Sequence, residues 1–214
     1  MADLIRTEYD DCDLSLFNTG TLRSNSVLPK GEVTVRMIND LLPMPDPVIL
    51  MKVSGEIILS ILENAVSAWP ALDGRFACFS GLKFRFDPEQ PSGSRVHSVK
   101  NLDGSCFNLS KEAKYKVAVK HFVAVGKDGY TAFKDPSVEW LIDVNSAISI
   151  KDIVLKAFKE FGPDCKLDQK REDIRNLRSA LMHANDLERS EAGFVKLRPE
   201  IDGRVIQEPK PTPK

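Results

Sequence analysis

The stretch VILMKVSGEIILSILENAV, residues 48–66, decides the fold class because a strand pattern and a helix pattern follow each other directly. Residues 48–53 form an apolar run of strand length, which is typical of a strand inside a sheet. Ser54-Gly55-Glu56 then opens a helix that Pro70 ends. The apolar positions spaced for burial on this helix are Ile58, Ile61, Leu62, Ala65 and Trp69.

The alternation of strands and helices continues on both sides of this stretch. Before it, the sequence predicts the end of a helix over residues 2–9, a strand over 14–17 and a helix that Thr34 caps. After it, the expected strands are 82–86, 96–99 and 115–119, and the expected helices are roughly 150–161 and 173–185. This order predicts an α+β fold with a mixed β-sheet core flanked by helices.

The chain is expected to divide into three parts. Residues 1–145 carry the strand-rich pattern and are predicted to form one domain whose first helix is truncated. Residues 146–206 are predicted to be a helical extension that returns to this domain. Residues 207–214 contain three prolines and little apolar content, so we expect a disordered tail.

Composition limits the partners and the location. The formal net charge of -1 gives no overall field that favours nucleic acid or an anionic membrane. No apolar run approaches the roughly 20 residues that cross a bilayer, and the first residues have no signal-peptide pattern. The sequence therefore predicts neither a nucleic-acid partner nor a membrane partner, and it favours a cytoplasmic location. The four widely spaced cysteines are expected to be buried free thiols: Cys12, Cys78, Cys106 and Cys165.

The first candidate loop is residues 18–24, which follow a predicted strand directly. Gly20 permits a tight backbone there, and Arg23 offers a planar, permanently charged fork that can bind a phosphate bidentately. The alternative interpretation is a surface turn with a solvated arginine.

The second candidate loop is residues 122–130. Asp128 carries a carboxylate that accepts hydrogen bonds, which suits the vicinal hydroxyls of a ribose or another sugar. Phe122 could present a flat face to a base. The alternative is a core phenylalanine followed by an Asp-Gly turn.

Neither loop holds a hydrolytic centre. The three histidines are scattered, and the clustered ligands that a two-metal phosphatase needs do not appear. The sequence also lacks a nucleophile elbow, a P-loop and a dinucleotide fingerprint. We therefore expect no catalytic residue, no metal ligand and no cofactor in this chain.

Six motifs in order resemble the C-terminal domain of the 5′-nucleotidase family. The first is Asn18-Thr19-Gly20-Thr21-Leu22-Arg23, which is similar to the family's Asn-x-Gly-x-Ile/Leu-Arg signature. The others are Gly31-Glu32-Val33-Thr34 with Leu41-Leu42-Pro43, Val53-Ser54-Gly55, Gly74-Arg75-Phe76 leading to Phe79-Ser80-Gly81, Phe122 with Gly126-Lys127-Asp128-Gly129-Tyr130, and residues 198–205.

The resemblance implies a division of labour between two domains. In the family, an N-terminal metallophosphoesterase domain holds two divalent metals of the Zn, Mn or Mg class and performs the hydrolysis. The C-terminal domain binds the organic part of the substrate and rotates to deliver its phosphate. The present chain would thus be a substrate-recognition domain of a metal-dependent 5′-nucleotidase-type phosphohydrolase, inactive alone.

The resemblance also implies roles for particular residues. Arg23 would contact the phosphate, and Asn18 would lie beside the base. Phe122 would stack on the base, while Asp128 would hold the ribose hydroxyls. The expected substrate-binding set is completed by Met44, which replaces the second aromatic plate, and by Gly81.

Two departures keep other functions open. Met44 lacks a ring, and Asp46 puts a carboxylate where the usual loop has an amide. A phosphorylated sugar needs no base sandwich, so one alternative is a sugar-phosphate phosphatase of the same family. Another alternative is a free-standing, non-catalytic ligand-binding protein.

Overall fold

The computed structural model describes residues 1–9, 11–24, 26–160 and 202–211. Its larger sheet has the strand order β3-β1-β6-β2-β7. These strands are Ala77–Ser80 (β3), Leu14–Asn18 (β1), Lys114–Lys120 (β6), Val48–Ser54 (β2) and Glu139–Trp140 (β7). β1 and β6 are parallel, and the other pairs are antiparallel, so the predicted mixed sheet is confirmed.

A smaller sheet has the order β5-β4-β8. Its strands are Val96–Asn101 (β5), Leu82–Phe86 (β4) and Val205–Gln207 (β8), and β8 runs parallel to β4. The α-helices are Ala2–Glu8 (α1), Val35–Leu41 (α2), Gly55–Val66 (α3), His121–Ala124 (α4) and Ile150–Glu160 (α5). Short 3-10 helices occupy Thr19–Thr21 (η1), Lys127–Gly129 (η2) and Thr131–Lys134 (η3).

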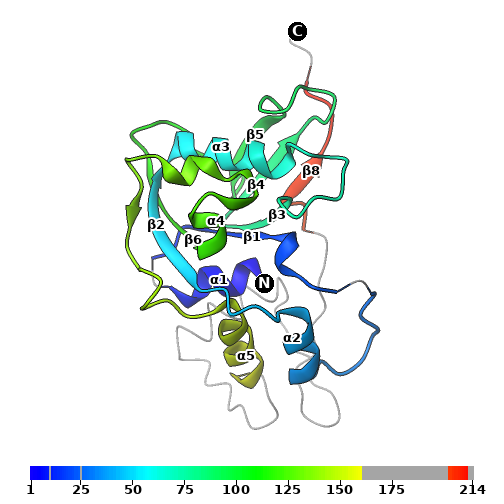
Figure 1. The fold of residues 1–214 in the computed structure, drawn as a ribbon. Coiled ribbons are helices and arrows are strands. Elements are labelled where there is room, and N and C mark those ends of the chain that lie inside the picture. Colours follow the sequence, from blue (N-terminus) through cyan, green and yellow to red (C-terminus); the bar gives the residue numbers. More distant parts are fainter. Residues whose placement is uncertain (10, 25, 161–201, 212–214) are drawn as a thin grey trace.

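Both faces of the larger sheet are covered, as Figure 1 shows. The helices α1, α2 and α5 lie on one face, and α3 lies on the other together with the smaller sheet. β2 accordingly alternates between two cores: Ile49 and Met51 belong to the core under α3, while Val48 and Leu50 belong to the other. The apolar run in β2 is therefore explained by burial on both faces, as predicted.

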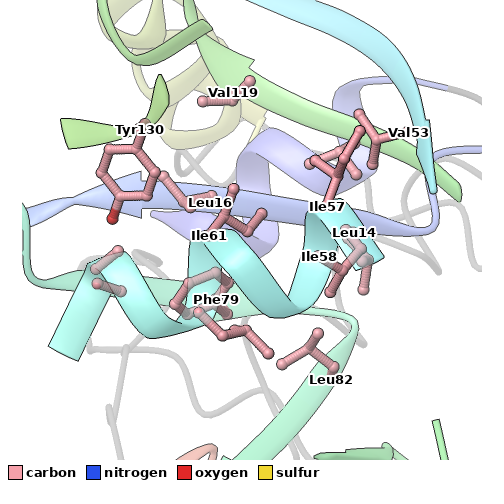
Figure 2. Packing of buried hydrophobic residues seen from close by; sticks show 14 of the residues in the cluster. Leu14, Leu16, Val53, Ile57, Ile58, Ile61, Phe79, Leu82, Val119 and Tyr130 are labelled. Carbon is pink, nitrogen blue, oxygen red and sulfur yellow. The ribbon is translucent and has the colours of Figure 1, made fainter. Parts of the chain in front are cut away.

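α3 begins where the sequence predicts. The Ser54 hydroxyl accepts a hydrogen bond from the Ile57 amide at 3.4 Å and caps the helix. Figure 2 shows Ile57, Ile58 and Ile61 of α3 packed over the residues of β1 and β3. The helix ends at Val66 and not beside Pro70, so the predicted helical position of Trp69 is wrong.

Trp69 still contributes to the core from the turn that follows α3. Its ring lies 5.6 Å from that of Phe76 and 6.0 Å from that of Phe86, measured between centroids. The helix stops early because the Ser67 hydroxyl and amide both bond back to the Asn64 carbonyl, which closes a tighter turn.

The predicted disorder of residues 207–214 does not hold for the start of that segment. Gln207 ends β8, and the Glu208 carboxylate accepts a hydrogen bond from Arg85 at 2.6 Å. Strand pairing with β4 satisfies backbone groups that an isolated tail would leave in water. The helix expected over residues 173–185 lies outside the described residues.

The expectation of buried thiols is confirmed for one cysteine of the described part. Cys12 is buried, whereas Cys78 and Cys106 are exposed. Cys78 lies on the outward side of the edge strand β3, and Cys106 follows a turn, so neither is covered. Cys165 lies outside the described residues.

Within the described residues, no helix has the length and apolar character needed to cross a membrane.

Candidate functional site

Five of the six predicted ligand residues lie at one edge of the larger sheet. Because β1 and β6 are parallel, their carboxyl ends at Asn18 and Lys120 lie at the same edge. The antiparallel strand β2 begins there, with Val48 opposite Lys120. The connecting segments at this edge are residues 19–34, 44–47 and 121–130, which carry four of the six predicted residues.

Asn18 joins the first candidate loop to the second. It is 1% exposed, and its amide donates to the Asp128 carboxylate at 2.8 Å and to the Gly74 carbonyl at 3.1 Å. Its side-chain oxygen accepts a hydrogen bond from the Thr21 hydroxyl at 2.8 Å. Both N–H groups of the Asn18 amide and one lone pair of its oxygen are therefore used to hold these loops in place. The structure thus brings Asn18 and Asp128 into direct contact.

Asp128 is held in a turn that glycines make possible. Its φ of 52° is left-handed, and Gly126 and Gly129 beside it have φ of 83° and 79°. The Asn64 side chain in α3 donates to the Asp128 carbonyl at 3.0 Å. Asn64 was not predicted as part of the site, because its spacing within α3 marks it only as a polar helix position.

A third loop approaches through a pair of glycines. A Cβ atom on Gly20 would lie 2.9 Å from the Gly74 Cα, and the Gly20 amide donates to the Gly74 carbonyl at 3.0 Å. Only glycine permits this backbone approach. The Tyr130 hydroxyl adds a bond to the Arg75 carbonyl at 2.6 Å, and burial raises the pKa of Tyr130. Hydrogen bonds therefore join the two candidate loops and the loop that carries Gly74 and Arg75.

Phe122 is 39% exposed, which excludes the alternative of a core phenylalanine. The ammonium of Lys120 lies 4.7 Å from the centre of its ring, within the range of a cation–π contact. The same ammonium pairs with the Asp46 carboxylate at 3.4 Å. Lys120 was not predicted as a site residue, because a lysine at a strand end is usually solvated.

Arg23 and Met44 occupy the outer part of this edge. The Arg23 side chain is exposed, and its backbone amide donates to the Leu41 carbonyl of α2 at 2.9 Å. Its guanidinium has no ion-pair partner among the residues that the structure describes. Met44 is 56% exposed in the segment between α2 and β2.

Gly81 is not brought together with the other five residues. It follows Ser80, which pairs with Ser15 near the start of β1, whereas Asn18 pairs with Ala77 at the opposite end. Its φ is 97°, and a Cβ atom there would lie 2.1 Å from the Asp13 carbonyl oxygen. The close passage of the backbone explains this glycine without a ligand.

The gathered groups suit the binding of a polar ligand with a planar part. They supply an exposed guanidinium, a carboxylate, an ammonium and an exposed ring. In the described part of the chain, no group of three or more His, Cys, Asp and Glu side chains could hold a metal ion. A pocket of about 320 Å³ is lined by residues of α4, η3, β7 and the segments between them, but by none of the six predicted residues.

These features define an α+β domain with a mixed sheet, and the sequence comparison gives its family. Residues 1–135 match the family described as 5′-nucleotidase, C-terminal domain. The match covers more than half of the chain, which therefore belongs to this family.

Individual relatives agree with this assignment. The chain is 30% identical over 136 residues to Protein 5NUC of Lutzomyia longipalpis, covering 59% of this chain and 24% of that protein. It is 32% identical over 124 residues to a probable 5′-nucleotidase of Treponema pallidum, covering 55% and 20%. The solved 5′-nucleotidase precursor of Thermus thermophilus has a TM-score of 0.66 and 27% identity, covering 98% of this chain and 35% of its own. The chain thus spans a minor part of each relative.

Proposed function

We propose that this chain is the substrate-recognition domain of a metal-dependent 5′-nucleotidase-type phosphohydrolase. The observation that carries the proposal is the hydrogen bond between Asn18 and Asp128 at 2.8 Å, which unites the two candidate loops. It supports a ligand that contacts both loops at once. A nucleotide fits this requirement because it combines a phosphate, a sugar and a planar base.

Each residue has a role that its surroundings support. Only one carboxylate oxygen of Asp128 accepts from Asn18, so the other is left to accept from ribose hydroxyls. The exposed ring of Phe122 offers a stacking surface for a base. The exposed guanidinium of Arg23 suits a phosphate, which it can bind through two parallel hydrogen bonds.

Hydrolysis is assigned to a separate N-terminal metallophosphoesterase domain. The small share of each relative that this chain covers supports such a partner. In that arrangement the divalent metals, of the Zn, Mn or Mg class, belong to the partner domain. This chain would hold the nucleoside and present the phosphate, and it would be inactive alone.

Met44 favours a second candidate, a phosphorylated sugar. It is exposed where a second aromatic ring would complete a base sandwich, and one missing stacking partner costs a base about 1–3 kcal/mol. A sugar phosphate has no base to stack, so the presence of Met44 in place of a ring would not weaken its binding. A free-standing ligand-binding protein would use the same edge without a catalytic partner.

Isothermal titration with adenosine, AMP and a hexose phosphate separates these candidates. AMP should bind, and Arg23→Ala should weaken AMP far more than adenosine. Asp128→Ala should weaken both ligands alike, and Phe122→Ala should weaken both base-bearing ligands. The matched control is Arg36→Ala, because Arg36 is an exposed arginine of α2 whose ion pair, within the described residues, is with Asp40 on the same helix.

The outcomes lead to different conclusions. Tighter binding of the hexose phosphate than of AMP, unchanged by Phe122→Ala, would identify a phosphorylated sugar as the substrate in place of a nucleotide. Equal losses of AMP and adenosine in Arg23→Ala would refute the phosphate role of Arg23. Phosphatase activity of the chain alone with manganese or zinc would refute the division of labour.

A further inference from the structure

One polar residue near the end of α3 reaches from the core to the second candidate loop. Its neighbours on the helix, Leu62 and Ala65, are buried in the core that α3 forms with the larger sheet. Asn64 is half-buried between them, and its side-chain amide donates a hydrogen bond to the Asp128 carbonyl at 3.0 Å. The packing of α3 therefore fixes the place of this donor.

The turn at Asp128 depends on contacts of this kind. Its φ of 52° and ψ of 30° lie in the left-handed region, which is unfavourable for a residue with a side chain. Such a conformation persists where the surrounding structure holds it. The Tyr130 amide closes the turn on the Lys127 carbonyl at 3.1 Å, and Asn64 holds the Asp128 carbonyl from the side of α3.

The Asn64 side chain also lies against the next residue of the turn. A Cβ atom on Gly129 would lie 2.5 Å from the Asn64 side-chain oxygen, so there is no room for a larger residue at this position. The backbone of Asn64 is held as well, because its carbonyl accepts from the Ser67 hydroxyl at 2.7 Å. Asp128 and Gly129 thus rest on a fixed part of α3.

Two different elements therefore hold Asp128 from opposite ends. Asn64 of α3 holds its carbonyl, and Asn18 at the end of β1 donates to one oxygen of its carboxylate at 2.8 Å. The backbone angles of a residue limit the directions that its side chain can take. Without the hydrogen bond from Asn64, the turn can leave the left-handed region and carry the carboxylate away from its present direction.

We propose that Asn64 is a positioning residue for ribose recognition, which holds the turn at Asp128 so that the carboxylate faces both hydroxyls of a ribose. This inference rests on the proposed function, in which Asp128 accepts hydrogen bonds from those hydroxyls. Asn64 acts through Asp128 and not on the ligand itself. Its loss should therefore weaken recognition of the hydroxyls and leave recognition of the phosphate unchanged, because Arg23 lies on a different loop.

The experiment is isothermal titration of the whole chain with adenosine, 2′,3′-dideoxyadenosine and AMP. Adenosine should bind at least about tenfold more tightly than the dideoxynucleoside, the ratio expected when hydrogen bonds to a charged group are missing. Asn64→Ala should bring these two affinities together. The ratio between AMP and adenosine should stay as it is in the unaltered chain, whereas a general loosening of the domain would change both ratios.

Ser60→Ala is the matched control on the same helix. Ser60 lies four positions before Asn64 and so on the same face of α3. Its hydroxyl donates to the Glu56 carbonyl of the same helix at 3.0 Å, so its removal leaves the turn at Asp128 untouched. This variant should keep both affinity ratios.

A second variant removes the donor without removing the side chain. Asn64→Asp keeps the shape, but an ionised carboxylate has no N–H to give to the Asp128 carbonyl. It should also bring the affinities for adenosine and the dideoxynucleoside together. Thermal unfolding of each variant shows whether the fold is kept, and Asn64→Asp carries the test if Asn64→Ala unfolds.

Three results would overturn the inference and leave nucleotide binding intact. The first is equal affinity of the unaltered chain for adenosine and the dideoxynucleoside, which would refute recognition of the hydroxyls. The second is a preference for adenosine that survives both Asn64 variants. The third is a change of both affinity ratios, or unfolding, in both variants, which would make Asn64 a support of the whole domain.

Failure of the proposed function would look different. In that case the unaltered, folded chain would bind neither adenosine nor AMP, and the inference about Asn64 would fall with it.

Discussion

The side-chain amide of Asn18 donates a hydrogen bond to the Asp128 carboxylate at 2.8 Å, although 110 residues separate them in the chain. The contact exists because Asn18 ends β1 and Asp128 follows β6, which runs parallel beside it. Both residues were predicted as ligand contacts, and the structure shows that they also hold each other. In the proposed function, ligand binding and local stability would therefore be coupled at this edge.

Asn18→Ala should lower the free energy of unfolding by about 1–3 kcal/mol, because it leaves two part-buried acceptors, the Asp128 carboxylate and the Gly74 carbonyl, without this donor. Urea denaturation measures the loss. The control Asn101→Ala removes a solvent-exposed hydrogen bond to Ser105 and should change stability by less than about 0.5 kcal/mol. Equal losses in both variants would show that the Asn18 amide does not hold the loops.

Leu62→Ala should destabilise the fold by about 2–5 kcal/mol, because it opens a cavity under α3. Leu62 is fully buried at 0% exposure, whereas Leu72 is 102% exposed, so Leu72→Ala is a control with identical chemistry. Leu72→Ala should shift stability by less than about 0.5 kcal/mol. Similar midpoints of chemical denaturation for the two variants would contradict the packing of α3 on the sheet.

Cys12 should react with thiol reagents only slowly. Burial raises the pKa of Cys12 to about 11, so little of it is thiolate at pH 8. In variants that keep one cysteine each, Cys106 should react about a hundredfold faster than Cys12, because Cys106 is exposed. Urea should abolish the difference, and equal rates in the native state would contradict the burial of Cys12.

Acid should loosen the attachment of β8. A hydrogen bond from the Lys210 amide lowers the pKa of Asp87, and one from the Arg85 guanidinium lowers the pKa of Glu208. Because both pKa values are depressed in the fold, their stabilisation is present above the ordinary carboxyl pKa of about 4 and is lost as the pH falls below it.

The amide of Glu208 reports this loss, since it donates to the Phe86 carbonyl at 3.0 Å. Its hydrogen-exchange protection factor should fall as the pH drops below about 4, the ordinary carboxyl pKa. Glu208→Gln should lower the protection at pH 7 and weaken its dependence on pH. A protection factor that stays constant to pH 3 would contradict a role for these carboxylates.

The sequence predicts well those strands and helices whose apolar residues recur at regular intervals because they are buried. The apolar run of β2 and the apolar face of α3 were both predicted, because burial on two faces or on one face leaves a repeating pattern. The end of α3 was misplaced at Pro70, since the tighter turn at Ser67 depends on local hydrogen bonds that no periodicity records.

The site could be predicted only in part. Phe122 and Asp128 lie in a glycine-containing motif, which marks both of them as candidates within the sequence itself. Lys120 has no such mark, because its ion-pair partner Asp46 is 74 residues away in the chain. Gly81 shows the converse, since its motif suggests a ligand while its surroundings show close backbone packing.

Local chemistry thus accounts for which segments become strands, helices and turns, since side-chain periodicity, caps and glycines act within a few residues. The sequence also sufficed to identify the family, through motifs kept in order along the first 135 residues. The pairing of β1 with β6 belongs to the tertiary structure, because it depends on contacts between residues about a hundred positions apart. That pairing brings Asn18, Lys120 and Asp128 to one edge, where loop residues become a candidate binding site.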